Sequence, residues 1–456
     1  MNVRTVPGGR VEGVTRVPGD KSIAHRWLIL AAGGMGRSVL VGLPRSLDVR
    51  STASCLATVA PAARASLEAW ARNGGQAAEG HGSTWNRGLD DGSSPALEVE
   101  GEGWTGIRPP DRDLDCGNSG TTMRLLTGVG AGAPFVTVLV GDASLSSRPM
   151  ERVAEPLRLM GARIATTSGH APVRVEGGGL HGIRYSMAIP SAQVKAAILL
   201  AGVVASGETI VAEAVSTRDH TERALAALGA PSRVVDGFVR VSAFQHDGFR
   251  ATVPGDPSSA AFLVAAAALT GGGLTVRGLG LNPSRLGFLG VMKRMGIDTQ
   301  FTVTSEELGE PVGDLGVAPC EAILPVRVEE AELPIVIDEV PVLALLAAHA
   351  SGGTTFFGAG ELRVKESDRL TRVADAIAGL GGTAVVEGDR LVVAGGGLEG
   401  GIARSGGDHR IAMAAVVGAM GARRPSRVEG IEDADVSFPG FVEILRSLGG
   451  PLEVEG

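Results

Sequence analysis

Lysine, arginine and acidic side chains gather at the starts of several apolar segments in this chain. Lys21, Ser22 and Arg26 open the first segment, and the spacing of Ser22 and Arg26 places them on one face of a helix. Similar groups recur at Arg148, Lys365–Arg369 and Asp408–Arg410. A helix N-terminus has free N–H groups and a positive potential, and arginine adds bidentate clamping of carboxylate or phosphate. The pattern predicts a cleft that binds phosphate and carboxylate groups.

Two carboxylates within these groups are candidates for general acid–base chemistry. Asp338 precedes an apolar segment, and Glu366 stands beside Lys365 and Arg369, whose spacing indicates one helical face. Each has a structural alternative: Asp338 could cap a helix, and Glu366 could pair with Arg369 three residues on. For any single cation the alternative is a solvated charge at a helix end.

The segments that must position these groups are predicted to be six helices, apolar nearly all round and therefore buried. Each begins at Ser, Asp or Asn and ends near Gly, which are the residues that cap helices. They fall within residues 17–32, 116–128, 191–202, 253–268, 337–348 and 408–418. Amphipathic second helices are expected at 150–161, 221–229, 284–296, 367–381 and 441–449.

Glycine separates these elements, with 68 residues in 456, against a usual share of about 7%. A strand followed by a glycine turn recurs at 97–106, 173–182 and 391–400, and each copy fits G-x-G-x-x-G. A second strand follows instead of the helix that a dinucleotide site requires, so the glycines are interpreted as turn residues. The chain is therefore predicted to contain six similar units of strands and helices.

The length of 456 residues exceeds the roughly 250–300 that one core supports. The turn Val-Pro-Gly-Asp occurs twice, at 17–20 and 253–256, and marks where two halves begin. We expect an α/β fold with two similar domains of three units each: residues 19–252, and residues 1–18 plus 253–456. The active site would lie in the cleft between them. An exposed insertion is expected at 60–95.

Composition narrows the class of protein. The net charge of −8 argues against nucleic acid as a partner. No run of 18 apolar residues and no signal-like N-terminus occurs, so no membrane association is expected. Cys55, Cys116 and Cys320 lack metal-ligand spacing, and no G-x-x-x-x-G-K-[ST] phosphate loop is present. We expect a reduced, cytoplasmic protein without structural metal or disulfides.

Seven motifs resemble those of the 5-enolpyruvylshikimate-3-phosphate (EPSP) synthase family. They are Pro18–Ser22, Gly117–Arg124, Arg148–Met150, Ser191–Gln193, Thr217–Glu222, Arg363–Arg369 and Asp408–Arg410. The resemblance runs from about Val14 to Phe441 and implies the inside-out α/β barrel of enolpyruvyl transferases. Its two domains, each of three βαβαββ units, close over the substrates.

The reaction that the resemblance implies moves the enolpyruvyl group of phosphoenolpyruvate to the 5-hydroxyl of shikimate 3-phosphate and releases phosphate. This is a step of the shikimate pathway to chorismate and the aromatic amino acids. It requires no metal or organic cofactor, and the enzyme is expected to be a monomer.

The resemblance also implies a role for each candidate residue. Asp338 resembles the base that takes the 5-hydroxyl proton, and Glu366, with Lys21, resembles the pair that protonates the methylene carbon. The residues that resemble contacts to shikimate 3-phosphate are Lys21, Ser22, Arg26, Ser191, Gln193, Arg218, Asp338 and Lys365. Those that resemble the phosphoenolpyruvate site are Lys21, Gly120, Arg148, Gln193, Arg369 and Arg410.

Two departures from the family pattern stand out. No lysine precedes Phe438-Pro439, where some members have one, and Arg218 with Ser191-Ala-Gln193 resembles the subgroup in which arginine binds the phosphate. The related UDP-N-acetylglucosamine enolpyruvyl transferases place a reactive cysteine before their Arg-Pro motif, and residues 141–148 contain none. That activity and a non-catalytic repeat scaffold that binds anions are the alternatives.

Overall fold

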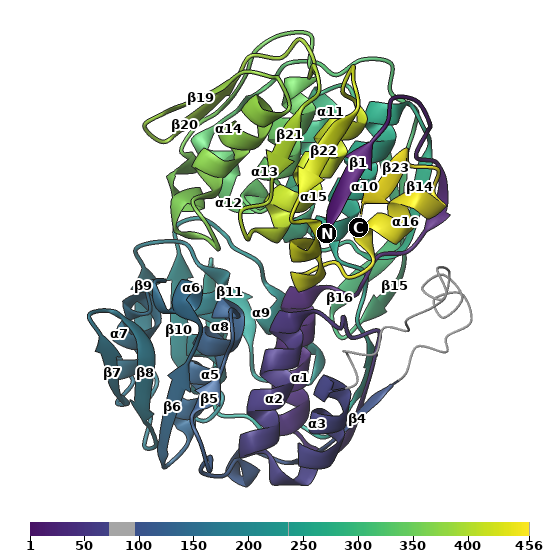
Figure 1. Cartoon of the computed structure of the whole chain (residues 1–456). Helices are drawn as coiled ribbons and strands as arrows, with labels where there is room; N and C mark the ends of the chain where they lie inside the picture. The colour runs from purple at the N-terminus through teal and green to yellow at the C-terminus, as the bar shows by residue number, and fades with distance from the viewer. Residues whose placement is uncertain (73–95, 236, 456) are drawn as a thin grey trace.

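The computed structural model describes residues 1–72, 96–235 and 237–455, which fold around two separate hydrophobic cores (Figure 1). One core takes its side chains from Ile23 to Val253, and the other from Val3–Val17 and Ala260–Leu452. In Figure 1 the first domain, purple to teal, lies below the second, and strand β1 lies among the yellow C-terminal strands. The α/β fold with two similar domains is confirmed.

The strands of the first domain form three small sheets, each with one parallel pair and otherwise antiparallel pairing. The first contains β3 (Met35–Val41), β4 (Leu97–Glu102) and β13 (Arg250–Thr252). The second contains β5 (Leu114–Asp115), β6 (Val136–Val140), β7 (Arg163–Thr167) and β8 (His170–Glu176). The third contains β9 (Arg184–Met187), β10 (Thr209–Glu213), β11 (Arg233–Val235) and β12 (Phe238–Val241).

The second domain repeats this arrangement, again with one parallel pair in each of three sheets. The first contains β2 (Gly13–Thr15), β14 (Leu274–Gly280), β15 (Thr299–Glu307) and β16 (Glu310–Val317). The second contains β17 (Arg327–Val328), β18 (Thr354–Phe356), β19 (Ala384–Glu387) and β20 (Arg390–Val393). The third contains β1 (Asn2–Thr5), β21 (Ile402–Arg404), β22 (Ser426–Glu429) and β23 (Leu452–Glu455). The described residues thus contain six repeat sheets.

The six apolar helices are confirmed and lie buried at the centres of the two domains. They are α1 (Lys21–Gly33), α5 (Gly120–Gly132), α8 (Ala192–Gly202), α10 (Pro257–Thr270), α13 (Val340–Ala348) and α15 (His409–Met420). Five have the expected side-chain caps, at Asp20, Ser119, Ser191, Asp256 and Asp408. The cap prediction is wrong for α13, where Glu339 precedes the helix without capping it and Asp338 faces arginine side chains instead.

Second helices accompany the buried ones. They are α2 (Leu47–Val59), α7 (Glu151–Leu159), α9 (His220–Ala227), α11 (Gly287–Arg294), α14 (Arg369–Gly379) and α16 (Phe441–Ser447). Only α2 has no counterpart among the predicted helices. Because Asp368 caps α14, Lys365 precedes the helix, and the prediction that Lys365 and Arg369 share a helical face is wrong.

Short helical segments complete the described chain. They are η1 (Pro61–Ala63), α3 (Arg64–Arg72), η3 (Trp104–Gly106), α6 (Ala143–Ser146), η4 (Pro283–Arg285), η5 (Glu330–Glu332), α12 (Leu333–Val336), η6 (Ala359–Val364) and η7 (Ile431–Val436). Among the residues that the structure describes, no helix combines the length and the apolar character needed to cross a membrane.

The expected insertion at 60–95 is packed in its first part. The expectation of exposure is wrong for Ala63, Leu67, Trp70 and Ala71, which pack into the first core, while residues 61, 62, 64, 65, 69 and 72 are exposed as expected. Residues 73–95 lie outside the described part.

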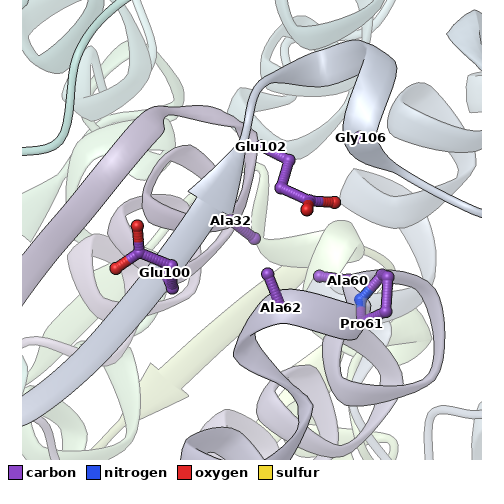
Figure 2. Close-up of a pocket in the computed structure, with 7 residues that line it drawn as sticks. All are labelled: Ala32, Ala60, Pro61, Ala62, Glu100, Glu102 and Gly106. Atoms are coloured by element: carbon purple, nitrogen blue, oxygen red, sulfur yellow. The ribbon is translucent and has the colours of Figure 1, made fainter.

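Beside η1 is a small pocket that holds none of the predicted site residues (Figure 2). It is lined by Ala32, Ala60, Pro61, Ala62, Glu100, Glu102 and Gly106.

The two Val-Pro-Gly-Asp turns meet where the chain passes between the domains. Gly19 and Gly255 form an antiparallel bridge, and the Asp20 and Asp256 amides donate to the carbonyls of the opposite turn at 2.7 and 2.9 Å. A Cβ on Gly19 would lie 2.2 Å from the carbonyl oxygen of Gly42, so this approach requires glycine. The bounds 19–252 and 1–18 plus 253–456 stay a prediction.

Candidate active site

Asp338, just before α13, lies among cations from both domains. Arg218, from the first domain, donates a hydrogen bond to its carboxylate. In the second domain Arg369 and Arg410 each approach that carboxylate to 3.8 Å, and Arg410 also donates to its carbonyl oxygen at 2.8 Å. Burial alone would raise the pKa of the carboxyl, but these arginines and Lys365 hold the pKa of Asp338 well below its usual range. Asp338 is therefore ionised at neutral pH.

Glu366 forms a second carboxylate centre in the same cluster. Its Oε2 lies 2.5 Å from Nη2 of Arg369, and its Oε1 lies 3.9 Å from Nη1 of Arg148 in the first domain. The Ser144 hydroxyl of the first domain donates to the Glu366 carbonyl oxygen at 3.4 Å. Burial would raise the pKa of Glu366, but the cationic side chains of Arg369, Arg148 and Lys21 hold it well below its usual range. The ion-pair alternative for Glu366 thus describes a real contact, within a larger cluster.

Two arginines lie beside the start of α5: Arg124 on that helix, and Arg148 between α6 and α7. Arg148 donates to Oδ1 of Asn118 at 2.5 Å, and Arg124 donates to Oε1 of Gln193 at 2.6 Å. Burial first, and then the charge of Arg148, lowers the pKa of Arg124 to about 10. A Cβ on Gly120 would lie 2.9 Å from Nη1 of Arg124 and 3.3 Å from Nη1 of Arg148. Glycine therefore leaves both guanidinium groups room at this helix start.

The start of α1 carries the next predicted residues. Nζ of Lys21 lies 2.9 Å from Oδ2 of Asp48, and the hydroxyl of Ser22 lies 3.5 Å from Nη1 of Arg218. Ser191 is at the start of α8, where its hydroxyl accepts from the Val194 amide at 3.4 Å. These groups lie on the first-domain side of the cluster.

Arg26 differs from its neighbours because protein groups already bind its guanidinium. Nε donates to the Thr221 hydroxyl at 2.8 Å, Nη1 to the Ser22 carbonyl at 2.8 Å and Nη2 to the Ala192 carbonyl at 3.4 Å. Arg26 therefore connects the starts of α1, α8 and α9 by hydrogen bonds. Its geometry favours holding Ser22 and the segment around Arg218 in place.

Several residues of the cluster are absent from the sequence-based site. Asn118 and Arg124 lie inside the Gly117–Arg124 motif, so that motif could have indicated them. Asp408 accepts from Nε of Arg369 at 2.8 Å, and burial first, then neighbouring Lys21, lowers the pKa of His409 to about 3, so its imidazole is neutral. Asp48 had no sequence signal, because its partner Lys21 lies on another helix.

Among the residues that the structure describes, no three His, Cys, Asp or Glu side chains are arranged to hold a metal ion. What the cluster offers is two ionised carboxylates enclosed by guanidinium and ammonium groups of both domains. Such a site can bind polyanionic ligands and move protons beside them.

The fold is that of the enolpyruvyl transferases. The enolpyruvyl transferase NikO from Streptomyces tendae, 18% identical, superposes with a TM-score of 0.74 over 99% of this chain and 98% of its own. The chain belongs to the EPSP synthase (3-phosphoshikimate 1-carboxyvinyltransferase) family, whose model matches residues 6–79 and 89–445. The family resemblance and the fold class are thereby confirmed.

Relatives match over nearly their whole length. The 3-phosphoshikimate 1-carboxyvinyltransferase of Halorhodospira halophila is 45% identical over 460 residues, covering 100% of this chain and 98% of the relative. That of Methylococcus capsulatus is 44% identical, covering 98% and 97%. A solved EPSP synthase from Acinetobacter baumannii, 35% identical, has a TM-score of 0.83 with full coverage of both chains.

Proposed function

We propose that this chain transfers the enolpyruvyl group of phosphoenolpyruvate to the 5-hydroxyl of shikimate 3-phosphate and releases phosphate. The observation that carries the proposal is the cluster in which cations of both domains surround Asp338 and Glu366. Two anionic substrates need several cations, and an addition–elimination reaction needs a base and an acid. The cluster provides both.

In this proposal shikimate 3-phosphate binds on the first-domain side. Ser22, Ser191 and Arg218 receive its phosphate, with Lys21, Gln193 and Lys365 around the ring and Arg26 holding Ser22 in place. A phosphate that draws Arg218 away from Asp338 removes one of the cations that depress the pKa of this carboxyl. The pKa of Asp338 then rises, and the carboxylate becomes a better acceptor for the 5-hydroxyl proton.

Phosphoenolpyruvate binds between the start of α5 and the second domain. Arg148, Arg369 and Arg410 pair with its phosphate and carboxylate, Gln193 lies between the two ligands, and Gly120 leaves room for them. Phosphoenolpyruvate draws Arg369 and Arg148 away from Glu366, which raises the pKa of this carboxyl and lets it take up a proton. Glu366, with Lys21, then delivers a proton to the methylene carbon while the 5-hydroxyl oxygen bonds to the neighbouring carbon. The tetrahedral ketal then loses phosphate, and the methyl group returns a proton, which restores the carbon–carbon double bond.

The test is phosphate release on mixing the purified chain with phosphoenolpyruvate and shikimate 3-phosphate. We expect release that needs both substrates, and none with UDP-N-acetylglucosamine as acceptor. Release only with UDP-N-acetylglucosamine would favour the related transferase activity, and no release with either acceptor would contradict the proposal.

Replacing Gly120 with alanine is expected to raise the KM for phosphoenolpyruvate about 10-fold, because the added methyl displaces Arg124 and Arg148. The KM for shikimate 3-phosphate should change little. Steady-state kinetics test this, with Gly290→Ala as the matched control: Gly290 is also helical, on α11, and a Cβ there meets nothing within 4 Å. Equal effects of the two variants would contradict the steric explanation.

Binding of shikimate 3-phosphate is expected to bring the two domains closer, because its phosphate and ring engage groups from both. Solution scattering should show a smaller radius of gyration with this ligand than without it, and inorganic phosphate alone should cause no change. An unchanged profile with the ligand would count against a two-domain clamp.

We also propose the domain bounds 19–252 and 1–18 plus 253–456. We propose that the protein is a monomer, since one chain provides both sides of the site, and that it is located in the cytoplasm.

A further inference from the structure

A second polar cluster lies where the two domains join, and all its members except the partly exposed Asp219 are buried. We call it the border cluster and define it as Asp20, Asp219, His220, Asp256, Asn282, Arg285 and Glu310. Arg285, at the end of η4 and 3% exposed, is its centre. Its Nη1 donates to Asp20 of the first domain, and its Nη2 donates to Oδ1 of Asp256 in the second domain at 2.8 Å. One guanidinium thus binds the aspartates of both Val-Pro-Gly-Asp turns.

Asn282, three residues earlier, makes a second connection across the border. Its Nδ2 lies 2.7 Å from Oδ1 of Asp219 in the first domain and 2.9 Å from Oε2 of Glu310 in the second. Oε1 of Glu310 in turn lies 2.7 Å from Nδ1 of His220, and both side chains are buried. The turn from Asn282 to Arg285 therefore contacts the first domain at two separate helix starts.

Both of these helix starts carry groups of the proposed active site. Asp20 directly precedes Lys21 and Ser22, and Asp219 directly follows Arg218. On the second-domain side, Nη2 of Arg285 donates to the Ser258 hydroxyl at 2.8 Å. That hydroxyl bonds to Glu339, the residue after Asp338. The border cluster thus lies behind the site and contacts each of the segments that bring Arg218 to Asp338.

We propose that Asn282 and Arg285 are positioning residues that favour the domain arrangement in which Lys21, Ser22 and Arg218 face Asp338. Without Arg285, two buried aspartates would face each other without a shared cation, and the arrangement that brings them together would lose its main attraction. The apparent affinity of a ligand falls in proportion to the population of the competent state. This inference rests on the proposed function for the identity of the ligand.

The test compares Arg285→Lys and Asn282→Ala with wild type. Lysine keeps the charge but not the planar fork that spans two carboxylates. In Asn282→Ala, Asp219 keeps Arg223 and Glu310 keeps His220, so this variant is expected to fold. The control is Arg294→Gln on neighbouring α11, whose surface ion pair with Glu332 lies away from the border.

We expect Arg285→Lys to raise the dissociation constant for shikimate 3-phosphate about 10-fold, and Asn282→Ala to raise it about 3-fold. The ligand concentration at half-contraction in solution scattering should rise by the same factors. Turnover at saturating substrates should fall less than about 3-fold, because saturation restores the competent population. A purely structural role would lower the melting temperature without moving the binding constant of the folded protein.

Binding and contraction need no turnover, so a wild type that binds and contracts but releases no phosphate would contradict the proposed function alone. Unchanged dissociation constants in both folded variants would overturn the inference. So would a wild type that does not contract, or an equal effect of Arg294→Gln. If Arg285→Lys fails to fold, Asn282→Ala decides: a wild-type dissociation constant there overturns the inference.

Discussion

Asp338→Ala is expected to lower turnover about 10²-fold or more while shikimate 3-phosphate still binds. Alanine removes the group that accepts the 5-hydroxyl proton. It leaves in place Arg218, Arg369 and Arg410, which contact this carboxylate in the structure. With their anionic partner gone, these cations are free to pair with the substrate, so affinity should be kept or increased.

Calorimetric titration and single-turnover kinetics separate these two effects. Asp338→Asn, which keeps the shape of the side chain, should show the same loss of turnover. The matched control is Glu339→Gln, because Glu339 is the adjacent buried acid and its amide variant can still accept from the Ser258 hydroxyl. Near wild-type turnover in both Asp338 variants would contradict its assignment as the base, and so would an equal loss in Glu339→Gln.

Arg369→Met is expected to destabilise the fold by about 3–5 kcal/mol, because it leaves the buried carboxylate of Asp408 and the partly buried one of Glu366 without their shared cation. Arg369 is 1% exposed; its Nε lies 2.8 Å from Oδ2 of Asp408, and its Nη2 lies 2.5 Å from Oε2 of Glu366. The variant should also lose phosphoenolpyruvate binding, since the proposed site loses a guanidinium that bidentate recognition requires.

A double-mutant cycle with Asp408→Asn tests the electrostatic origin of this loss. Removing the buried carboxylate should relieve part of the penalty, so the double variant should be more stable than the sum of the single effects by about 1–3 kcal/mol. Urea unfolding measures each free energy of unfolding. Arg390→Met serves as the control, because its pair with Glu387 is half exposed and should contribute at most about 1 kcal/mol. Additive effects in the cycle would contradict the prediction.

The sequence by itself determined the repeated architecture, because the residues that indicate each helix and turn lie next to one another in the chain. Cap residues such as Ser119 and Ser191, followed by apolar runs and glycine, indicate where buried helices begin and end, whatever they pack against. Motifs that resemble a known family then indicated the chemistry of the site. The local signal failed at α13, where Asp338 binds arginines instead of capping the helix, and at Lys365, which precedes the helix that begins with Arg369.

Only the tertiary structure decided which charges meet. Arg218 reaches Asp338 across 120 positions of sequence and from another domain, and no local periodicity carries that information. The same holds for Asp48 beside Lys21. It also holds for Arg285, which follows no sequence pattern of its own and binds both repeated turns only because the folded chain brings them together. Coulomb interactions depend on distance in space and on burial, and the packing of two domains fixes both.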